Sequence, residues 1–248
     1  MNLRLPAPLQ VTELAGTDST NRVLKELARA GAPAGTLVLA HRQTAGRGRL
    51  GKAFHSPAGG LYLSLLLRPG NRVVKPQSIT AAAAVAVCDA LEKSGVRDPK
   101  IKWVNDIYVQ GRKVCGILAE SALNPDGSAQ WIVLGVGLNL TTPAEGWPRE
   151  LRHIAGSLFD NADPVRDTAL AERLIIALWS LCNAPEQPEI LARYRAKNLV
   201  PGRKILVLQG ESSRQAKALY IDDDYRLVVE FSDGGTAILD SGEVSLKL

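Results

Sequence analysis

The sequence contains few cysteines and no long hydrophobic run. Three cysteines are present and no two of them form a CxxC pair, so neither a disulfide framework nor a zinc site is expected. The longest apolar run, residues 79–88, has about half the length that a bilayer requires. The first fourteen residues include two prolines and no continuous apolar stretch, which argues against a signal peptide. These absences favour a cytoplasmic protein without a membrane partner.

Aromatic residues and histidines are also scarce. The chain has 4 Trp, 5 Tyr and 3 Phe, whereas 46% of its 248 residues are hydrophobic, so the core must consist mainly of Ala, Val, Leu and Ile. This composition is ordinary for a globular protein and argues against disorder. The three histidines, His41, His55 and His153, are scattered and suggest no Ser-His-Asp or Cys-His arrangement. The chain is long enough for one large domain or two unequal ones.

Positive charge is concentrated in the larger, N-terminal part of the chain. Residues 1–196 contain 23 basic and 17 acidic residues, whereas residues 197–248 contain 7 basic and 8 acidic ones. An anionic ligand is therefore expected to bind to the larger part. The isoelectric point of 9.2 leaves a nucleic-acid-binding module as a remote alternative. No nucleic acid is expected as partner, because the aromatic residues of the last segment are not interleaved with basic ones.

The order of the predicted elements is typical of an α+β fold. Helices are expected between the polar cluster at 17–21 and Gly31, and at residues 78–94, 164–181 and 188–196; strands are expected at residues 37–40, 60–67, 101–109, 113–120 and 131–140. The glycine of the turn at residues 110–112 indicates that two of these strands form a hairpin. Strands and hairpins are mixed with helices rather than alternating strictly, so a largely antiparallel or mixed sheet is expected.

After residue 198 the pattern changes to short alternating strands joined by polar turns. These strands are expected at residues 205–208, 216–221, 227–231 and 236–239. About fifty residues of this kind predict a small β-barrel. The boundary is expected near Pro201, which divides the chain into one domain of residues 1–196 and another of residues 197–248.

Residues 46–52, with the sequence GRGRLGK, match two phosphate-binding templates by coincidence. They fit both GxGxxG and GxxxxGK, but both templates require a helix that begins at the loop. The loop instead continues into AFHSPAGG, which cannot begin a helix, and Ala53 stands where a P-loop has Ser or Thr. Neither template therefore applies.

The same loop places three cations among three glycines. Arg47, Arg49 and Lys52 would repel one another when the loop is empty, and folding over an anion would relieve this repulsion. Bare glycine backbone would let the loop approach the ligand closely. The alternative is a solvated basic loop without function.

Two further segments suggest a site. On a strand, Lys102 and Asp106 would lie on the same face, with Lys113 across the predicted hairpin. Two charges on an otherwise apolar hairpin need partners if they are buried, although an exposed face with ordinary ion pairs is an equal alternative. The glycines of GVGLN, residues 135–139, are a weaker signal of a bulge or of a ligand against the backbone.

Five segments taken together resemble the biotin–protein ligases. They are DSTN (18–21), QTAGRGRLGK (43–52), GGLYLS (59–64), KWVNDIYVQGRKVCGIL (102–118) and GVGLNL (135–140), in that order. NLVPGRKI and GEVSL, near the end of the chain, resemble the last domain of that family. The resemblance implies a mixed sheet with helices, similar to class II aminoacyl-tRNA synthetases, followed by a small Src-homology-3-like β-barrel.

The resemblance also implies the reaction and its residues. Biotin and MgATP would give biotinyl-5′-AMP and pyrophosphate, and biotin would then pass to one lysine of a biotin carboxyl carrier protein domain. Residues matching the biotin contacts are Ser19, Thr20, Asn21, Gln43, Arg47, Gly48, Arg49 and Lys113. Residues matching nucleotide contacts are Lys52, Phe54, Asn105 and Asn139. The implied catalytic residues are Lys113, Arg49, Lys102 and Asp106, and Asp106 is also a candidate ligand of Mg²⁺.

Three positions depart from the pattern of the family. Val104 stands where Pro is frequent, Lys52 where Arg is frequent, and Phe54 where Trp is common. Lysine lacks the bidentate geometry of arginine, and phenylalanine is a smaller stacking surface than tryptophan. These departures concern affinities rather than the reaction.

The resemblance sets further expectations about regulation, assembly and alternatives. The DSTN cluster lies close to the start of the sequence, without a preceding winged helix-turn-helix, so no repressor function is expected. Some members of the family are dimers built on the catalytic-domain sheet, which makes a homodimer the expected assembly. Lipoate and octanoyl ligases or transferases have a similar core and are the nearest alternative, although they generally lack the GRGRxGK string with its KWxND partner.

Overall fold

The computed structural model describes residues 1–70, 74–209, 212–240 and 243–246. Its largest element is a seven-stranded mixed sheet with the strand order β1-β2-β3-β7-β6-β5-β4. These strands are β1 (Gln10–Leu14), β2 (Thr36–Ala40), β3 (Gly60–Leu67), β4 (Lys100–Lys102), β5 (Asp106–Val109), β6 (Arg112–Leu123) and β7 (Ala129–Asn139). β1 and β2 are parallel, and all other neighbouring pairs are antiparallel.

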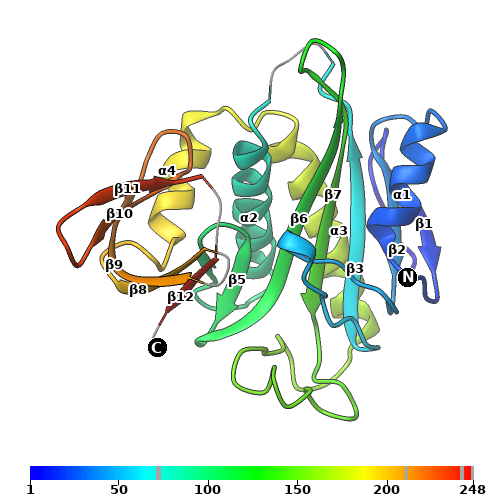
Figure 1. The fold of residues 1–248 in the computed structure, drawn as a ribbon. Coiled ribbons are helices and arrows are strands. Elements are labelled where there is room, and N and C mark those ends of the chain that lie inside the picture. Colours follow the sequence, from blue (N-terminus) through cyan, green and yellow to red (C-terminus); the bar gives the residue numbers. More distant parts are fainter. Residues whose placement is uncertain (71–73, 210–211, 241–242, 247–248) are drawn as a thin grey trace.

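Helices cover both faces of this sheet (Figure 1). The helices are α1 (Thr20–Arg29), α2 (Pro76–Lys93), α3 (Pro164–Cys182) and α4 (Pro188–Lys197). α1 packs against β2, β3 and β7 on one face, where Leu24 and Ala28 belong to a buried cluster with Val38 and Leu66. α2 and α3 pack together on the opposite face, against the main core.

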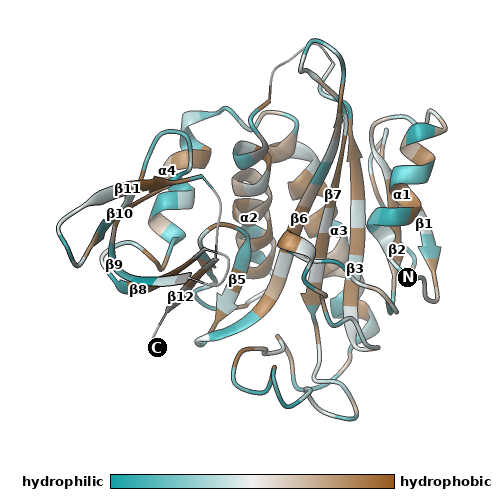
Figure 2. Ribbon diagram, viewed as in Figure 1, coloured by the Kyte–Doolittle hydropathy of each residue, from teal (hydrophilic) through white to brown (hydrophobic). Residues whose placement is uncertain are grey.

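The alternation of side chains along β7 explains why one face of the sheet is open. Ile132, Leu134, Val136 and Leu138 point into the main core, and Figure 2 shows hydrophobic residues along β3 and β7. On the other face, Trp131 and Val133 lie in the cluster beneath α1. The next positions on that face are Gly135, Gly137 and Asn139, so large apolar side chains give way to bare backbone.

A second, five-stranded sheet occupies the C-terminal part of the chain. It consists of β8 (Lys204–Gln209), β9 (Ser212–Ile221), β10 (Leu227–Phe231), β11 (Thr236–Leu239) and β12 (Glu243–Leu246), in the order β11-β10-β9-β8-β12. All of its pairs are antiparallel. Its inward residues, among them Ile205, Ala218 and Leu227, belong to the same buried cluster as the core of the large sheet.

The strand predicted at residues 101–109 is wrong in one respect. The structure divides it into β4 and β5, because Trp103 and Val104 turn inward and are only 3% and 4% exposed. Lys102 and Asp106 are consequently not on one strand but are register partners on neighbouring antiparallel strands. They still share a face of the sheet, for a different reason from the one predicted.

The other predicted helices and strands are confirmed, as is the α+β architecture. Two strands were not predicted from the sequence. β1 has no buried residue, so its sequence does not need the alternation of apolar and polar residues that predicts a strand. β12 lies in the short segment GEVSL, which was related to the family but not predicted as a strand. Within the described residues, no helix combines the length and apolar character needed to cross a bilayer.

Candidate functional site

A cavity of about 340 Å³ lies over the open face of the large sheet. Its lining includes all but one of the residues predicted for the site: Ser19, Thr20, Asn21, Gln43, Arg47, Gly48, Arg49, Lys52, Phe54, Asn105, Asp106, Lys113 and Asn139. The exception is Lys102, which does not line the cavity and has its ammonium 5.8 Å from the ring centre of Tyr108. The structure therefore brings together segments that are up to 120 residues apart in the sequence.

One end of the cavity is formed by the first turn of α1. Ser19 is the N-cap, and its hydroxyl accepts a hydrogen bond from the backbone N–H of Arg22 at 3.4 Å. The backbone N–H and the hydroxyl of Thr20 both donate to Oε1 of Gln43, at 2.9 and 3.1 Å. Nε2 of Gln43 in turn donates to the hydroxyl of Ser56 at 2.9 Å. These bonds hold several neutral polar groups in fixed directions at the cavity wall.

Asn21 completes this end by lying flat against β7. A Cβ on Gly135 would collide with the Asn21 amide, so only glycine leaves room for it. Oδ1 of Asn21 accepts a hydrogen bond from Ser64 at 2.6 Å, and Nδ2 donates to Oε2 of Glu120 at 2.8 Å. With a different partner at each end, the orientation of the amide is determined.

Glu120 links this amide to the surrounding charges. Its other carboxylate oxygen accepts a hydrogen bond from Nζ of Lys25 at 2.7 Å. Burial by itself would raise the pKa of Glu120, but the hydrogen bonds from Lys25 and Asn21 and the positive charge of Arg47 lower the pKa below its ordinary value of 4.5. Glu120 is therefore an anion held behind the polar end of the cavity.

The glycine-rich loop folds back on itself over the cavity. The N–H of Gly48 donates to the carbonyl of Lys52 at 2.7 Å, and the N–H of Phe54 donates to the carbonyl of Gly46 at 2.9 Å. A single 3₁₀ turn, Arg49–Gly51, lies between these two bonds, and the chain after it is extended. No α-helix begins at the loop, which confirms the prediction from the sequence. The two phosphate-binding templates are thus excluded by structure as well as by sequence.

The two arginines of this loop act at different ends of the site. Arg47 contributes to the lowered pKa of Glu120 at the polar end. Arg49 points the other way, and its Nη1 donates to Oδ1 of Asn105 at 3.4 Å. Burial lowers the pKa of the Arg49 guanidinium, while the nearby Asp106 carboxylate opposes this effect. The loop thus distributes its positive charge along the length of the cavity.

Lys113 and Asp106 form an ion pair at the second end. Nζ of Lys113 lies 2.7 Å from Oδ1 of Asp106, and both side chains are partly exposed to the cavity. The backbone of Lys113 pairs with the segment at 154–156: its N–H donates to the carbonyl of Ile154 at 2.8 Å, and its carbonyl accepts from Gly156 at 2.9 Å. Nδ2 of Asn139 donates to the Gly156 carbonyl at 3.0 Å, so Asn139 secures this pairing.

Phe54 forms a wall between the two ends. Gly116 and Gly137 are register partners on β6 and β7, and a Cβ on either would collide with the Phe54 ring. The ring also packs edge-on against Tyr62, with 6.4 Å between centroids, and has the Lys113 ammonium 5.8 Å from its centre. The glycines of GVGLN therefore mark close approach of protein side chains rather than a bulge.

Some lining residues were not identified from the sequence. Trp147, Leu151, Ile154 and Ala155 line the cavity near the second end, and the Trp147 ring packs edge-on against His55 at 6.2 Å. The segment that contains them is polar, rich in turns and without periodicity, so nothing in it predicted a position. The single available signal was a tryptophan in a loop of such composition.

The charge of the cavity wall indicates the kind of ligand. Arg47, Arg49, Lys52 and Lys113 line it, whereas Asp106 is the one carboxylate among its described lining residues. This excess of cations favours an anion. No group of three or more His, Cys, Asp or Glu side chains in the described part of the chain could hold a metal ion by itself. A single carboxylate suits a Mg²⁺ ion that arrives with a phosphate ligand, because Mg²⁺ commonly takes one or two carboxylates plus phosphate oxygens.

Comparison with known proteins gives a consistent result. A model of the Biotin/lipoate A/B protein ligase family matches residues 14–139, about half of the chain. The Biotin–[acetyl-CoA-carboxylase] ligase of Mycobacterium tuberculosis is 34% identical over 252 residues, which cover 95% of this chain and 88% of that protein. The Bifunctional ligase/repressor BirA of Bacillus subtilis is 34% identical over 223 residues, which cover 87% of this chain and 68% of that protein.

A solved structure extends this similarity to the fold. The biotin protein ligase from Aquifex aeolicus, in a complex with biotin and ATP, has a TM-score of 0.74 and 27% identity to this chain. The alignment covers 96% of this chain and 98% of that one, so both sheets are included.

The contact between Phe54 and the sheet generates a first prediction. Gly137→Ala should lower the free energy of unfolding by about 1–3 kcal/mol, because the new methyl group has no room beneath the Phe54 ring. Urea denaturation measures this difference. In a Phe54→Ala background the same substitution should cost much less, and equal costs in the two backgrounds would show that the ring does not lie on Gly137.

The lowered pKa of Glu120 generates a second prediction. A carboxyl group with a lowered pKa in the folded state stabilises the protein above its ordinary pKa of 4.5, and this stability is lost as the pH falls through the folded-state pKa. Glu120→Gln should therefore lower the free energy of unfolding most near pH 7. The difference in this free energy between variant and wild type should shrink below about pH 4.5. Urea denaturation at several pH values, with the exposed Glu145→Gln as control, tests this; a difference independent of pH would contradict it.

Proposed function

Because the chain belongs to the biotin/lipoate A/B protein ligase family and, within it, to the biotin–protein ligases, we propose that it joins biotin to ATP and then to a protein lysine. The first step would give biotinyl-5′-AMP and pyrophosphate, and the second would biotinylate a biotin carboxyl carrier protein domain. The observation that best supports this is one cavity with a neutral polar end and a cationic end, divided by the Phe54 ring.

The polar end suits the ureido ring of biotin. The ring is neutral and presents both N–H donors and a carbonyl acceptor, which short hydroxyl and amide groups can match. Ser19, Thr20, Asn21 and Gln43 offer such groups at the cavity wall. Arg47 and Gly48 would close over the ligand from the loop. We infer that biotin binds with its ring here and its carboxylate towards Lys113.

Activation requires two anions to meet. An oxygen of the biotin carboxylate attacks the α-phosphorus of ATP, a new P–O bond forms, and the bond to the pyrophosphate oxygen breaks. Lys113 and Arg49 lie where they would offset the repulsion between carboxylate and phosphate and stabilise the charge of the transition state. No side chain has to become covalently linked to the substrate.

The nucleotide would occupy the second end. Lys52, Phe54, Asn105 and Asn139 line the cavity and would contact the nucleotide, and the aromatic ring of Trp147 would add an apolar surface there. Asp106 would hold the Mg²⁺ of MgATP together with the phosphates, and that ion supplies charge neutralisation when bound. Lys102 does not line the cavity but is the register partner of Asp106. Its positive charge would act on the nucleotide from the far side of Asp106.

The second step needs a protein acceptor. The amine of the acceptor lysine attacks the carbonyl carbon of the mixed anhydride, an amide bond forms, and AMP leaves. We propose that residues 1–196 carry out both reactions and that residues 197–248 form a second domain, packed against the first, that assists them.

The direct test is a product analysis. The purified protein is incubated with MgATP and either biotin or lipoate, pyrophosphate release is followed, and bound adenylate is identified by mass spectrometry. Biotin-dependent release with biotinyl-5′-AMP as product supports the proposal. Release with lipoate alone would assign the chain to the other branch of its family.

Removing the cation at the reacting centre should slow the first step. Lys113→Ala is expected to reduce biotinyl-5′-AMP formation by a factor of roughly 100 to 1,000, the usual effect of one preorganised charge at a transition state. Biotin affinity, measured by calorimetry, should fall less, because the contacts at Ser19–Asn21 and Gln43 remain. Pyrophosphate release close to that of the wild type would show that Lys113 is not catalytic.

Arg49 should retain the intermediate as well as promote its formation. Biotinyl-5′-AMP is a mixed anhydride that any amine can attack, so the loop must enclose it until the acceptor arrives. Arg49→Gly is expected to release free adenylate, which would then biotinylate an unrelated lysine-rich protein added to the reaction. Blotting that protein for biotin measures the effect.

Leu50→Gly is the matched control for this experiment. It adds a flexible glycine at the exposed tip of the same loop without removing a charge. Bystander labelling by Arg49→Gly but not by Leu50→Gly would attribute retention to the guanidinium. Equal labelling by both variants would attribute it to loop rigidity and contradict the role of Arg49.

A further inference from the structure

The turn between β9 and β10 contacts the segment that leads to Asp106. Nε1 of Trp103 donates a hydrogen bond to the backbone carbonyl of Tyr225 at 2.9 Å, and both residues are buried. The hydroxyl of Tyr194, on α4, donates to the backbone carbonyl of Val104 at 3.0 Å. The rings of Tyr194 and Tyr225 pack edge-to-face, 5.6 Å apart. The two residues that interrupt β4 and β5 are thus held from outside their own sheet.

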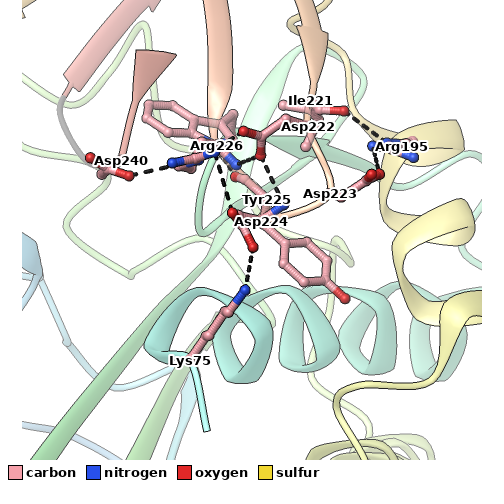
Figure 3. A network of polar contacts seen from close by, with 10 residues as sticks. Lys75, Arg195, Ile221, Asp222, Asp223, Asp224, Tyr225, Arg226 and Asp240 are labelled. Atoms are coloured by element: carbon pink, nitrogen blue, oxygen red, sulfur yellow. Dashed lines mark hydrogen bonds and ion pairs between the residues drawn. The ribbon is translucent and has the colours of Figure 1, made fainter.

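The turn that provides the Tyr225 carbonyl is braced by hydrogen bonds and an ion pair of its own residues (Figure 3). Oδ1 of Asp222 accepts hydrogen bonds from the backbone N–H groups of Asp224 and Arg226, both at 2.9 Å. Oδ2 of Asp222 accepts from Nε of Arg226 at 2.7 Å. Tyr225 has a φ of 62°, a left-handed conformation that a residue with a large side chain adopts only when its surroundings determine it. The direction of its carbonyl is therefore fixed.

Ion pairs tie this turn to the helices of the large sheet. Lys75, next to the start of α2, pairs with Asp224. Arg195, on α4, donates to the Ile221 carbonyl and pairs with Asp223, both at 2.8 Å (Figure 3). The C-terminal sheet is thus held at three points close to Trp103.

The residues after Val104 hold the cations of the cavity. Asn105 accepts the hydrogen bond from Arg49, and Asp106 pairs with Lys113. The carbonyl of Asn105 also accepts from the N–H of Ile117 at 3.0 Å, which fixes the segment on its other side. A shift of the Trp103–Val104 backbone would therefore move both side chains, and a misplacement of about 1 Å is enough to reduce a rate a hundredfold.

We propose that Trp103 is a positioning residue: its indole N–H, bound to the Tyr225 carbonyl of the C-terminal sheet, sets the geometry of Asn105 and Asp106 at the nucleotide end. The inference rests on the proposed function, since it concerns the ATP half of that reaction. It gives the C-terminal sheet a part in adenylate formation that requires no contact with the nucleotide.

The test separates ATP binding from biotin binding. Trp103→Phe keeps most of the buried ring but removes the indole donor. It should raise the KM for ATP in pyrophosphate release roughly tenfold, the loss expected from one buried hydrogen bond, and lower kcat as well. Biotin affinity measured by calorimetry should stay within a factor of two, because the polar end is not touched.

A matched tryptophan controls for lost stability. Trp131→Phe makes the same change at another buried tryptophan, beneath α1 and away from the nucleotide end. It should leave the KM for ATP unchanged. An equal rise in both variants would show a general effect of destabilisation and overturn the proposal, as would an unchanged KM and kcat in Trp103→Phe.

A second variant acts from the far side of the contact. Asp222→Ala loosens the turn without altering any residue of the cavity. Like Trp103→Phe, it should raise the KM for ATP. Combined with Trp103→Phe, it should add little further effect, because both changes break the same link. Full additivity of the two changes would overturn the proposal. If Trp103→Phe failed to fold, a normal KM for ATP in Asp222→Ala would by itself overturn it.

Assays of the wild type distinguish a failure of the proposed function from a failure of this inference. Wild-type protein that forms no adenylate from biotin and ATP contradicts the proposed function and the inference with it. Active wild type with normal Trp103→Phe and Asp222→Ala variants contradicts the inference alone.

Discussion

On the open face of the large sheet, the backbone is bare at Gly116, Gly135 and Gly137. A Cβ at Gly116 would lie 2.8 Å from the Phe54 ring, and at the other two positions it would collide with Phe54 or Asn21. Both the amide at the polar end and the ring between the two ends depend on this absence of side chains. Because cores are close-packed, a single methyl group at one of these positions would displace a wall of the cavity.

The distribution of charge depends on this bare backbone of β6 and β7. The glycine-rich loop reaches over the sheet, so that the positive charge of Arg47 lowers the pKa of Glu120 at one end while Arg49 reaches Asn105 at the other. Lys113 and Asp106 complete the second end from the hairpin of β5 and β6. At the first end the positive charge of Arg47 is opposed by the anionic Glu120 behind the polar groups, whereas Arg49 and Lys113 line the second end. This arrangement suits a ligand with an uncharged head and an anionic tail.

Local features of the site could be predicted from the sequence. The start of a helix at the polar cluster of residues 17–21, the glycine hairpin after Val109 and the failure of a helix to begin at the basic loop are set by neighbouring residues, and the structure confirms them. Which residue of the cluster is the cap, Ser19, came from the structure. The break at Trp103 could not be predicted, because its cause lies on α4 and in the C-terminal sheet. A segment with strand-like alternation that continues through Trp103 and Val104 looks like one strand when those partners are unknown.

The position of the remaining site residues is also a tertiary property. Trp147 and Ile154 belong to a segment without periodicity, and what places it is the pairing of its backbone with Lys113 and the Asn139 amide. Nor did the sequence show that Lys102 would lie outside the cavity, since its alternation with Asp106 assumed an unbroken strand. The segments that carry the resemblance to the biotin–protein ligases contribute residues to one cavity, and the family model and the relatives confirm the family. The arrangement within the cavity had to come from the structure.

The hydrogen bond between Trp103 and Tyr225 joins residues 122 positions apart. A ribosome synthesises the chain from its N-terminus, and early segments begin to fold before later ones emerge. The ribosome has therefore already synthesised α1, the basic loop and the strands β6 and β7, which carry the three glycines, before it makes the residues that hold Trp103. During translation the polar end of the cavity can form first, and the end that carries Asp106 is fixed only when the last fifth of the protein leaves the ribosome.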